Sequence, residues 1–291
     1  MTTDKKTEFA SRLRNGDYLT APGVFDLISA RIADRMGFPA LYMTGYGVVA
    51  SSFGLPDAGL ASYTEMVDRV KTIAASTLTP LIADGDTGYG DLLNVQRTVR
   101  GYEQAGAVAI QLEDQKIPKK CGHTPNRRVI PVDDMVAKIR VAVAARESEN
   151  FLVIARTDAR TQYGLAEAIG RGQAFAEAGA DVVFVEAPES VDEMIEICRE
   201  IDGPLMANMV NGGKTPLLSA EELKDLGYQI VIFPGTALLA AGSAVQSVYQ
   251  HLKATGSSRG LPTPLYDFEE FNRLMGFEEV WAFEKKWTDP S

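Results

Sequence analysis

The sequence predicts an α/β fold, and within that class a (β/α)8 TIM barrel with a C-terminal helical extension. Short apolar runs alternate with helical patterns eight times, the runs are apolar almost without interruption, and polar residues suited to chemistry follow six consecutive runs. Continuous apolar runs are typical of parallel strands covered on both faces. A doubly wound open sheet is the alternative, but no Gly-x-Gly-x-x-Gly turn follows the first run.

The predicted elements follow one another as strand and helix. The strands are expected at residues 18–21, 40–43, 80–83, 107–112, 152–155, 181–185, 204–207 and 230–233. The helices are expected at residues 24–36, 63–75, 92–105, 132–146, 166–178, 191–201, 220–226 and 237–252. Each strand and its helix form a crossover unit, so neighbouring strands run parallel. We therefore predict a catalytic barrel domain at residues 1–255.

A second region, residues 256–291, is predicted to be a linker and a helical tail. The linker at 256–264 is rich in Gly, Ser and Pro, and a helical pattern follows at 268–286. The apolar residues of the tail would share one face: Phe268, Phe271, Leu274, Met275 and Trp281. The barrel is already complete, so we expect this face to pack on another part of the protein or on a neighbouring subunit.

Composition excludes several classes of protein. The chain has 291 residues, 45% of them hydrophobic, which suffices for a sizeable core. Its net charge of −10, without a basic stripe, argues against nucleic-acid binding. No apolar run is long enough to span a membrane, and the polar N-terminus has no apolar signal core. Two dissimilar cysteines do not suggest a disulfide framework. We expect a soluble cytoplasmic protein.

The segment from Glu113 to His123 is the most informative part of the sequence for function. It begins with two carboxylates and ends with Cys121 between a pair of lysines and an imidazole, and Gly122 frees the backbone beside the thiol. A cysteine beside cations ionises more easily and so can exchange protons near neutral pH. The alternative is a solvated loop with an incidental cysteine.

The polar residues follow the predicted strands at the end where TIM-barrel enzymes carry their active sites. Asp84 and Asp86 follow the third strand, and both can face the barrel mouth only if the chain leaves regular pleating there. With Glu113 they form a carboxylate cluster that needs a cation to stay ionised. Oxygen ligands favour a hard ion, Mg²⁺ or Mn²⁺. Helix capping by the aspartates is the alternative. Arg156 could bind a substrate carboxylate or pair with Asp158.

At these residues the sequence resembles the isocitrate lyase/phosphoenolpyruvate mutase superfamily over nearly its whole length. The motifs are residues 54–57 (Gly-Leu-Pro-Asp), 84–88 (Asp-Gly-Asp-Thr-Gly), 119–123 (Lys-Lys-Cys-Gly-His), 155–158 (Ala-Arg-Thr-Asp), 185–188 (Val-Glu-Ala-Pro) and 207–209 (Ala-Asn-Met). Residues 119–123 resemble the branch that cleaves or hydrolyses carbon–carbon bonds. The resemblance implies a barrel whose C-terminal helix is exchanged between subunits, and a homotetramer built as a dimer of dimers.

The resemblance also implies roles for the matching residues. Asp84 would contact Mg²⁺ directly, while Asp57, Asp86 and Glu113 would hold its waters. The residues implied to bind substrate are Thr44, Gly45, Tyr46, Gly122, Arg156, Glu186, Asn208 and Pro234.

The implied catalytic residues are five. Cys121, on a mobile gating loop that includes His123, would be the general acid, and Tyr42 would receive the substrate hydroxyl proton. Arg156 would stabilise the developing charge, and Glu186 would orient substrate or water. Lys119 and Lys120 should favour a thiolate at Cys121, whereas a general acid must begin as a thiol.

The implied reaction is cleavage of the C2–C3 bond of a small 2-hydroxy dicarboxylate, giving a 2-oxo acid and a short carboxylic acid. Relatives that act on 2-methylisocitrate carry an arginine at the position of Leu239, and oxaloacetate hydrolases carry a serine near Pro234. These departures favour 2,3-dimethylmalate or another 2-alkylmalate as substrate. The alternatives are oxaloacetate hydrolysis or decarboxylation, methylisocitrate cleavage, and a non-catalytic barrel that binds a dicarboxylate.

Overall fold

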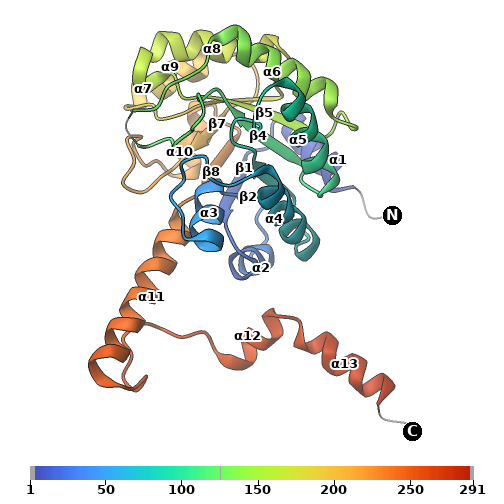
Figure 1. Ribbon diagram of the computed structural model, residues 1–291, viewed down its shortest axis with the longest axis vertical. Coiled ribbons are helices and arrows are strands. Elements are labelled where there is room, and N and C mark those ends of the chain that lie inside the picture. The colour runs from blue at the N-terminus through green and yellow to red at the C-terminus, as the bar shows by residue number, and fades with distance from the viewer. Residues whose placement is uncertain (1–3, 125, 289–291) are drawn as a thin grey trace. The chain divides into compact units, whose positions relative to one another are not determined.

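The predicted strands form one parallel sheet, which confirms the TIM barrel (Figure 1). The computed structural model describes residues 4–124 and 126–288. The strand order is β6-β5-β4-β3-β2-β1-β8-β7, and a parallel bridge between Val183 and Leu205 joins β6 to the segment that enters β7. The strands are β1 (Leu19–Val24), β2 (Leu41–Met43), β3 (Leu81–Asp84), β4 (Ala109–Glu113), β5 (Leu152–Thr157), β6 (Val182–Val185), β7 (Met206–Asn208) and β8 (Ile230–Phe233).

Helices connect successive strands, as the sequence pattern predicts (Figure 1). In the first part of the chain they are α1 (Lys5–Arg14), α2 (Leu27–Arg35), α3 (Gly45–Phe53), α4 (Tyr63–Ser76), α5 (Leu92–Gln104), α6 (Val132–Ala145), α7 (Arg160–Tyr163), α8 (Leu165–Glu177), α9 (Val191–Glu200) and α10 (Ala220–Leu226). The last three are α11 (Thr236–Thr255), α12 (Phe268–Leu274) and α13 (Phe277–Trp287). None of the described helices has the length and apolar character that crossing a membrane requires.

Alternation along each strand separates side chains inside the barrel from side chains that face the helices. In β4, Ala109 belongs to the interior cluster, whereas Ile110 and Leu112 pack in the cluster shared with the helices. Gln111 and Glu113 have the same parity as Ala109, and both are buried. The inward face of the strand therefore changes from apolar to polar toward its carboxyl end. This change is what places a polar site at one mouth of the barrel.

Two helices near the N-terminus escaped the sequence analysis. In α1, Phe9 and Leu13 are buried in the same cluster as Leu19 at the start of β1, so the helix closes the N-terminal end of the barrel. Its few apolar residues are too sparse for a clear helical period. The other is α3, which begins at the N-cap Thr44 and ends at Gly54 in the left-handed region, with φ 64°. Its two glycines are weak helix formers, so this segment has no clear helical pattern.

Contacts within the chain divide it into two units between Leu238 and Leu239. The second unit contains most of α11 together with α12 and α13, and Thr263 Oγ1 donates a hydrogen bond of 3.0 Å to Ser247 Oγ, joining the linker to α11. The predicted domains 1–255 and 256–291, and the exchange of the tail between subunits, stay predictions. Residues 1–3, 125 and 289–291, which belong to those domains, lie outside the described residues.

Candidate active site

A pocket lies at the carboxyl ends of the barrel strands, with a volume of about 560 Å³ including the part open to solvent. Most of the predicted site residues line it. They are Tyr42, Thr44, Tyr46, Asp57, Asp84, Glu113, Cys121, Gly122, His123, Arg156, Glu186, Asn208 and Pro234. The predicted residues outside this lining are its neighbours. Gly45 N donates to Asp84 Oδ2 at 3.2 Å, and the Asp86 carboxylate pairs with Lys119, which lines the pocket.

Asp84, the last residue of β3, and Asp86 lie close together because the chain turns sharply after the strand. Asp86 has a φ of 48°, in the left-handed region, and its backbone N–H donates to Asp84 Oδ1 at 3.1 Å. Gly85 is needed at this turn, since a Cβ would lie 2.8 Å from the Ile110 side chain. Burial and the charge of Asp86 raise the pKa of Asp84. The expected break in pleating is thus confirmed.

Lys119 supplies the cation that the sequence analysis required for the carboxylate cluster. Its buried Nζ lies 2.5 Å from Asp57 Oδ1 and 2.5 Å from Asp86 Oδ1. Burial alone would lower the pKa of Lys119, but the carboxylates of Asp86, Glu113 and Asp57 raise it well above its usual value. The ammonium group is therefore charged and committed to the carboxylates. Lys119 belongs to the motif at residues 119–123, but the sequence analysis did not assign it to this cluster.

The carboxylate oxygens also suit a hard divalent cation. Glu113 Oε1 is buried without a hydrogen-bond partner, and Asp57 Oδ1 and Asp86 Oδ1 are buried with only the Lys119 ammonium group against them. Carboxylate oxygens are the ligands that Mg²⁺ prefers. Across residues 4–124 and 126–288, no three acidic, histidine or cysteine side chains are placed to hold one ion directly. The donor set suits an ion that one or two carboxylates contact directly and others hold through water, as is common for Mg²⁺.

Arg156 is held among three carboxylates, those of Asp158, Glu186 and Glu113. Its Nε and Nη2 donate to Asp158 at 3.0 and 2.9 Å, Nη2 lies 3.3 Å from Glu186 Oε2, and Nε lies 3.5 Å from Glu113 Oε2. Asp158 also accepts from Arg127 Nη1 at 2.7 Å. Of the two interpretations left open by the sequence, the pairing with Asp158 is confirmed. Because Arg156 also lines the pocket, that pairing orients it and does not exclude contact with a ligand.

Cys121 lies on the loop after β4, with its backbone N–H donating to Asp57 O at 3.2 Å. Burial raises the pKa of the Cys121 thiol above its usual value, and the charge of Asp57 raises it further. The two neighbouring lysines predicted a thiolate, but the Lys119 ammonium group is ion-paired with Asp57 and Asp86. Cys121 is therefore a thiol at neutral pH, the form that a general acid requires.

Gly122 allows this loop to approach the barrel mouth. A Cβ at this position would lie 2.3 Å from Arg156 Nη2 and 2.9 Å from Glu186 Cδ. Next to it, His123 Nε2 lies 3.2 Å from Glu186 Oε1, and His123 Nδ1 accepts from the backbone N–H of Lys214 at 3.4 Å. The loop is thus seated on side chains of the barrel and on the segment after β7.

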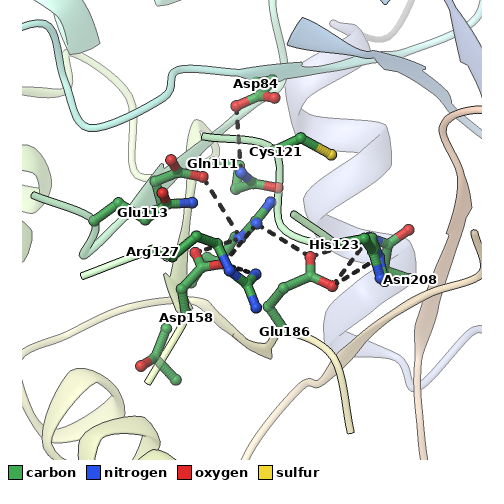
Figure 2. Close-up of polar contacts among 12 residues, drawn as sticks. Asp84, Gln111, Glu113, Cys121, His123, Arg127, Asp158, Glu186 and Asn208 are labelled. Carbon is green, nitrogen blue, oxygen red and sulfur yellow. Dashed lines mark hydrogen bonds and ion pairs between the residues drawn. The ribbon is translucent and has the colours of Figure 1, made fainter. Parts of the chain in front are cut away.

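The Glu186 carboxylate, directly after β6, is surrounded by the side chains of Arg156, His123 and Asn208. Asn208 Nδ2 donates to Glu186 Oε2 at 3.0 Å (Figure 2). Burial would raise the pKa of Glu186, but Arg156, His123 and Asn208 lower it to about 2. Glu186 is consequently an ionised carboxylate at neutral pH. It can orient a hydrogen-bond donor, but it is a weak base.

The sequence analysis missed several residues of the site. Gln111 on β4 is fully buried between Tyr42 and Asp84, and Asp158 holds Arg156. Strand parity could have found Gln111, since it lies midway between Ala109 and Glu113 on the inward face. Lys119 and Lys120 also line the pocket, as do Val210, Ile232 and Gly235. No residue type marks the last three as site residues.

Comparison with known proteins gives a consistent result over nearly the whole chain. The family described as phosphoenolpyruvate phosphomutase matches residues 9–253. The chain is 47% identical to 2,3-dimethylmalate lyase of Eubacterium barkeri over 270 residues, which is 93% of each protein. It is 42% identical to 2-methylisocitrate lyase of Aeropyrum pernix, covering 93% of this chain and 86% of that protein.

A solved structure with the same fold is oxaloacetate acetylhydrolase in complex with the inhibitor 3,3-difluorooxalacetate. The TM-score is 0.93 and the sequence identity 34%, with 99% of this chain and 98% of that chain covered. The similarities therefore extend through the pocket and through the last helices.

Proposed function

This chain belongs to the phosphoenolpyruvate mutase/isocitrate lyase superfamily and is an enzyme of its carbon–carbon lyase branch. We propose that it cleaves the C2–C3 bond of a small 2-hydroxy dicarboxylate, which is 2,3-dimethylmalate or another 2-alkylmalate. The observation that carries the proposal is the thiol of Cys121, kept protonated in the same pocket as Arg156 and the carboxylate cluster. A proton donor, an anion-binding cation and a set of oxygen ligands are the three components that this cleavage needs.

The proposed roles follow from the chemistry of the residues. Tyr42 accepts a hydrogen bond from the substrate 2-hydroxyl. As C2 becomes a carbonyl carbon, the hydroxyl proton passes to solvent at the open side of the pocket, because the neutral phenol of Tyr42, which donates to Gln111, is not a base. The C2–C3 bond then breaks, its electron pair stays on C3, and the fragment becomes an enolate-like dianion. Arg156 stabilises that charge, and Cys121 gives its proton to C3. Cys121 regains a proton from solvent when the products leave, so overall one proton moves from the hydroxyl to C3.

We propose that Mg²⁺ is the cofactor, with Asp84 in direct contact and Asp57, Asp86 and Glu113 holding its waters. The buried Glu113 Oε1, which has no hydrogen-bond partner, and the grouping of carboxylates in one pocket support this assignment. When bound, a divalent cation lowers the energy of the alkoxide that forms as the hydroxyl loses its proton. The backbone amides of residues 44–46, with Gly122 and Asn208, are proposed to hold a substrate carboxylate, and Glu186 to orient the substrate.

A second candidate activity is oxaloacetate hydrolysis, favoured by the similarity to oxaloacetate acetylhydrolase. Pro234 lines the pocket and has no N–H or hydroxyl to offer a reacting water, which favours the lyase. Methylisocitrate cleavage ranks third, because Leu239 in place of an arginine would leave a third carboxylate without a partner.

The test is a coupled assay for 2-oxo acid formation with 2,3-dimethylmalate, 2-methylisocitrate and oxaloacetate side by side, with Mg²⁺ and with EDTA. We expect the highest kcat/KM on dimethylmalate, and loss of activity in EDTA that added Mg²⁺ reverses. Highest turnover of the tricarboxylate would contradict the substrate assignment. Full activity in EDTA would contradict the metal assignment.

A further inference from the structure

A buried amide connects the two functional sides of the pocket. Gln111 lies on β4 directly opposite Asp84 in the register of β3 and β4, and its side chain is fully buried. Its Nε2 donates to Asp84 Oδ1 at 3.3 Å, as Figure 2 shows, and its Oε1 accepts from the Tyr42 hydroxyl at 2.7 Å. One side chain therefore contacts the proposed metal ligand and the proposed partner of the substrate hydroxyl.

The direction of both hydrogen bonds is fixed by Asp84. Its Oδ1 also accepts from Asp86 N at 3.1 Å, and its Oδ2 accepts from Gly45 N at 3.2 Å. Both carboxylate oxygens thus accept hydrogen bonds, so the group facing Asp84 must be the donor end of the Gln111 amide. The carbonyl end then faces Tyr42, and Tyr42 must donate its single proton to it.

We propose that Gln111 is a positioning residue that makes Tyr42 a hydrogen-bond acceptor toward the pocket, so that the site selects a ligand with a hydroxyl group at C2 over one with a carbonyl group there. This inference rests on the proposed function and specifies how its substrate class is recognised. A phenol whose proton is committed offers the pocket only lone pairs. A 2-hydroxy acid donates to those lone pairs, whereas a 2-oxo acid would bring a second acceptor against them.

A consequence concerns the end of the reaction. Cleavage converts the C2 hydroxyl into a carbonyl, so the contact with Tyr42 changes from a hydrogen bond to an unfavourable pairing of two acceptors. The 2-oxo acid is thereby held less tightly than the hydroxy acid from which it is made. The arrangement favours product release without any movement of Gln111 or Tyr42.

The experiment compares two acids that differ only at C2. The dissociation constants of lactate, tested as each enantiomer, and of pyruvate are measured by calorimetry, with Mg²⁺ and without divalent ions. We expect the wild-type protein to bind one lactate enantiomer more tightly than pyruvate. In Gln111→Leu the Tyr42 proton is free to turn to the pocket, so pyruvate binding should improve. The ratio of the two constants should then shift by about tenfold, the value of one hydrogen bond.

Two further variants separate positioning from a general loss of structure. In Gln111→Glu the new side chain still accepts from Tyr42, whether ionised or protonated, so the lactate preference should return. Gln104→Leu, which removes a surface glutamine that contacts Glu147, is the matched control and should behave as wild type. Thermal melting verifies that each variant is folded.

The result that overturns the inference is a lactate-to-pyruvate ratio that is the same in folded Gln111→Leu and wild type. The absence of any lactate preference in wild type, including no binding of either acid, overturns it as well. If Gln111→Leu does not fold, loss of the preference in Gln111→Glu decides against the inference, and its retention there supports it. Because this experiment measures only binding, its outcome is independent of the coupled assay. The inference can hold if the assay detects no lyase activity, and it can fail if the assay detects that activity.

Discussion

At the scale of single residues, this site is decided by where charges are placed. Lys119 lies two residues before Cys121 in the sequence and would be expected to stabilise a thiolate, yet its ammonium group is paired with Asp57 and Asp86. The thiol therefore experiences mainly burial, and its pKa rises. A charge two residues away in sequence thus matters less than the groups that surround the side chain in the folded protein.

This placement predicts the effect of removing the thiol. Cys121→Ser should lower kcat by about 10²- to 10⁴-fold, because a hydroxyl is a far weaker acid, while substrate binding is largely retained. The measurement is kcat from the coupled assay together with ligand affinity from calorimetry. Cys198→Ser is the matched control, since this half-buried thiol lies outside the pocket lining and should leave kcat unchanged. Normal turnover in Cys121→Ser would remove the general-acid assignment.

Glu186 predicts a pH dependence of stability. Its pKa is about 2 in the folded protein and about 4.5 when unfolded, so the folded state binds fewer protons between these values. The resulting stabilisation is present above pH 4.5 and is lost as the pH falls through about 2. Urea unfolding of wild type and Glu186→Gln at several pH values from 7 to 3 should show a difference that shrinks with falling pH. A difference that is constant with pH would contradict the low pKa.

At the scale of elements, the loop between β4 and α6 can approach the barrel mouth closely because residue 122 is a glycine. The loop carries Cys121 and His123, and its seating depends on the missing Cβ of Gly122, next to Arg156 and Glu186. A methyl group there would contact the Arg156 guanidinium well inside van der Waals distance. The loop would have to move outward, and the thiol would move with it.

The substitution Gly122→Ala should therefore lower kcat/KM by about tenfold or more, since small displacements of a catalytic group are costly. The melting temperature should change little, because the loop contributes few core contacts. Gly170→Ala in α8 is a suitable control, since a Cβ there meets nothing within 4 Å and its backbone needs no positive φ. Equal kcat/KM in Gly122→Ala and wild type would show that the loop does not need this close approach.

At the scale of the whole molecule, the helical tail is the feature that a single barrel does not require. The strands of the barrel end with β8, and α12 and α13 come after it in the chain. The resemblance to the superfamily predicts that the tail is exchanged between subunits of a homotetramer. The homotetramer and a cytoplasmic location remain predictions for this chain.

Removing the tail tests the assembly. Multi-angle light scattering should give a tetramer for the full chain and a smaller species for a chain that ends at residue 255. The reason is that an exchanged apolar helix buries surface on a neighbouring subunit. Thermal melting of the shortened chain checks that the barrel still folds. A tetramer that persists without residues 256–291 would show that other surfaces hold the subunits together.

The sequence by itself determined the barrel, because apolar runs at a regular spacing from helical patterns leave few other topologies. It also determined which strand ends carry polar groups, including Asp84, Arg156 and Glu186. Only the tertiary structure decided their partners: that Lys119 neutralises the carboxylates, that Asp158 orients Arg156, and that Gln111 joins Tyr42 to Asp84. These contacts link residues on different strands and loops, so their distances depend on strand register and loop path, which no local pattern in the sequence specifies.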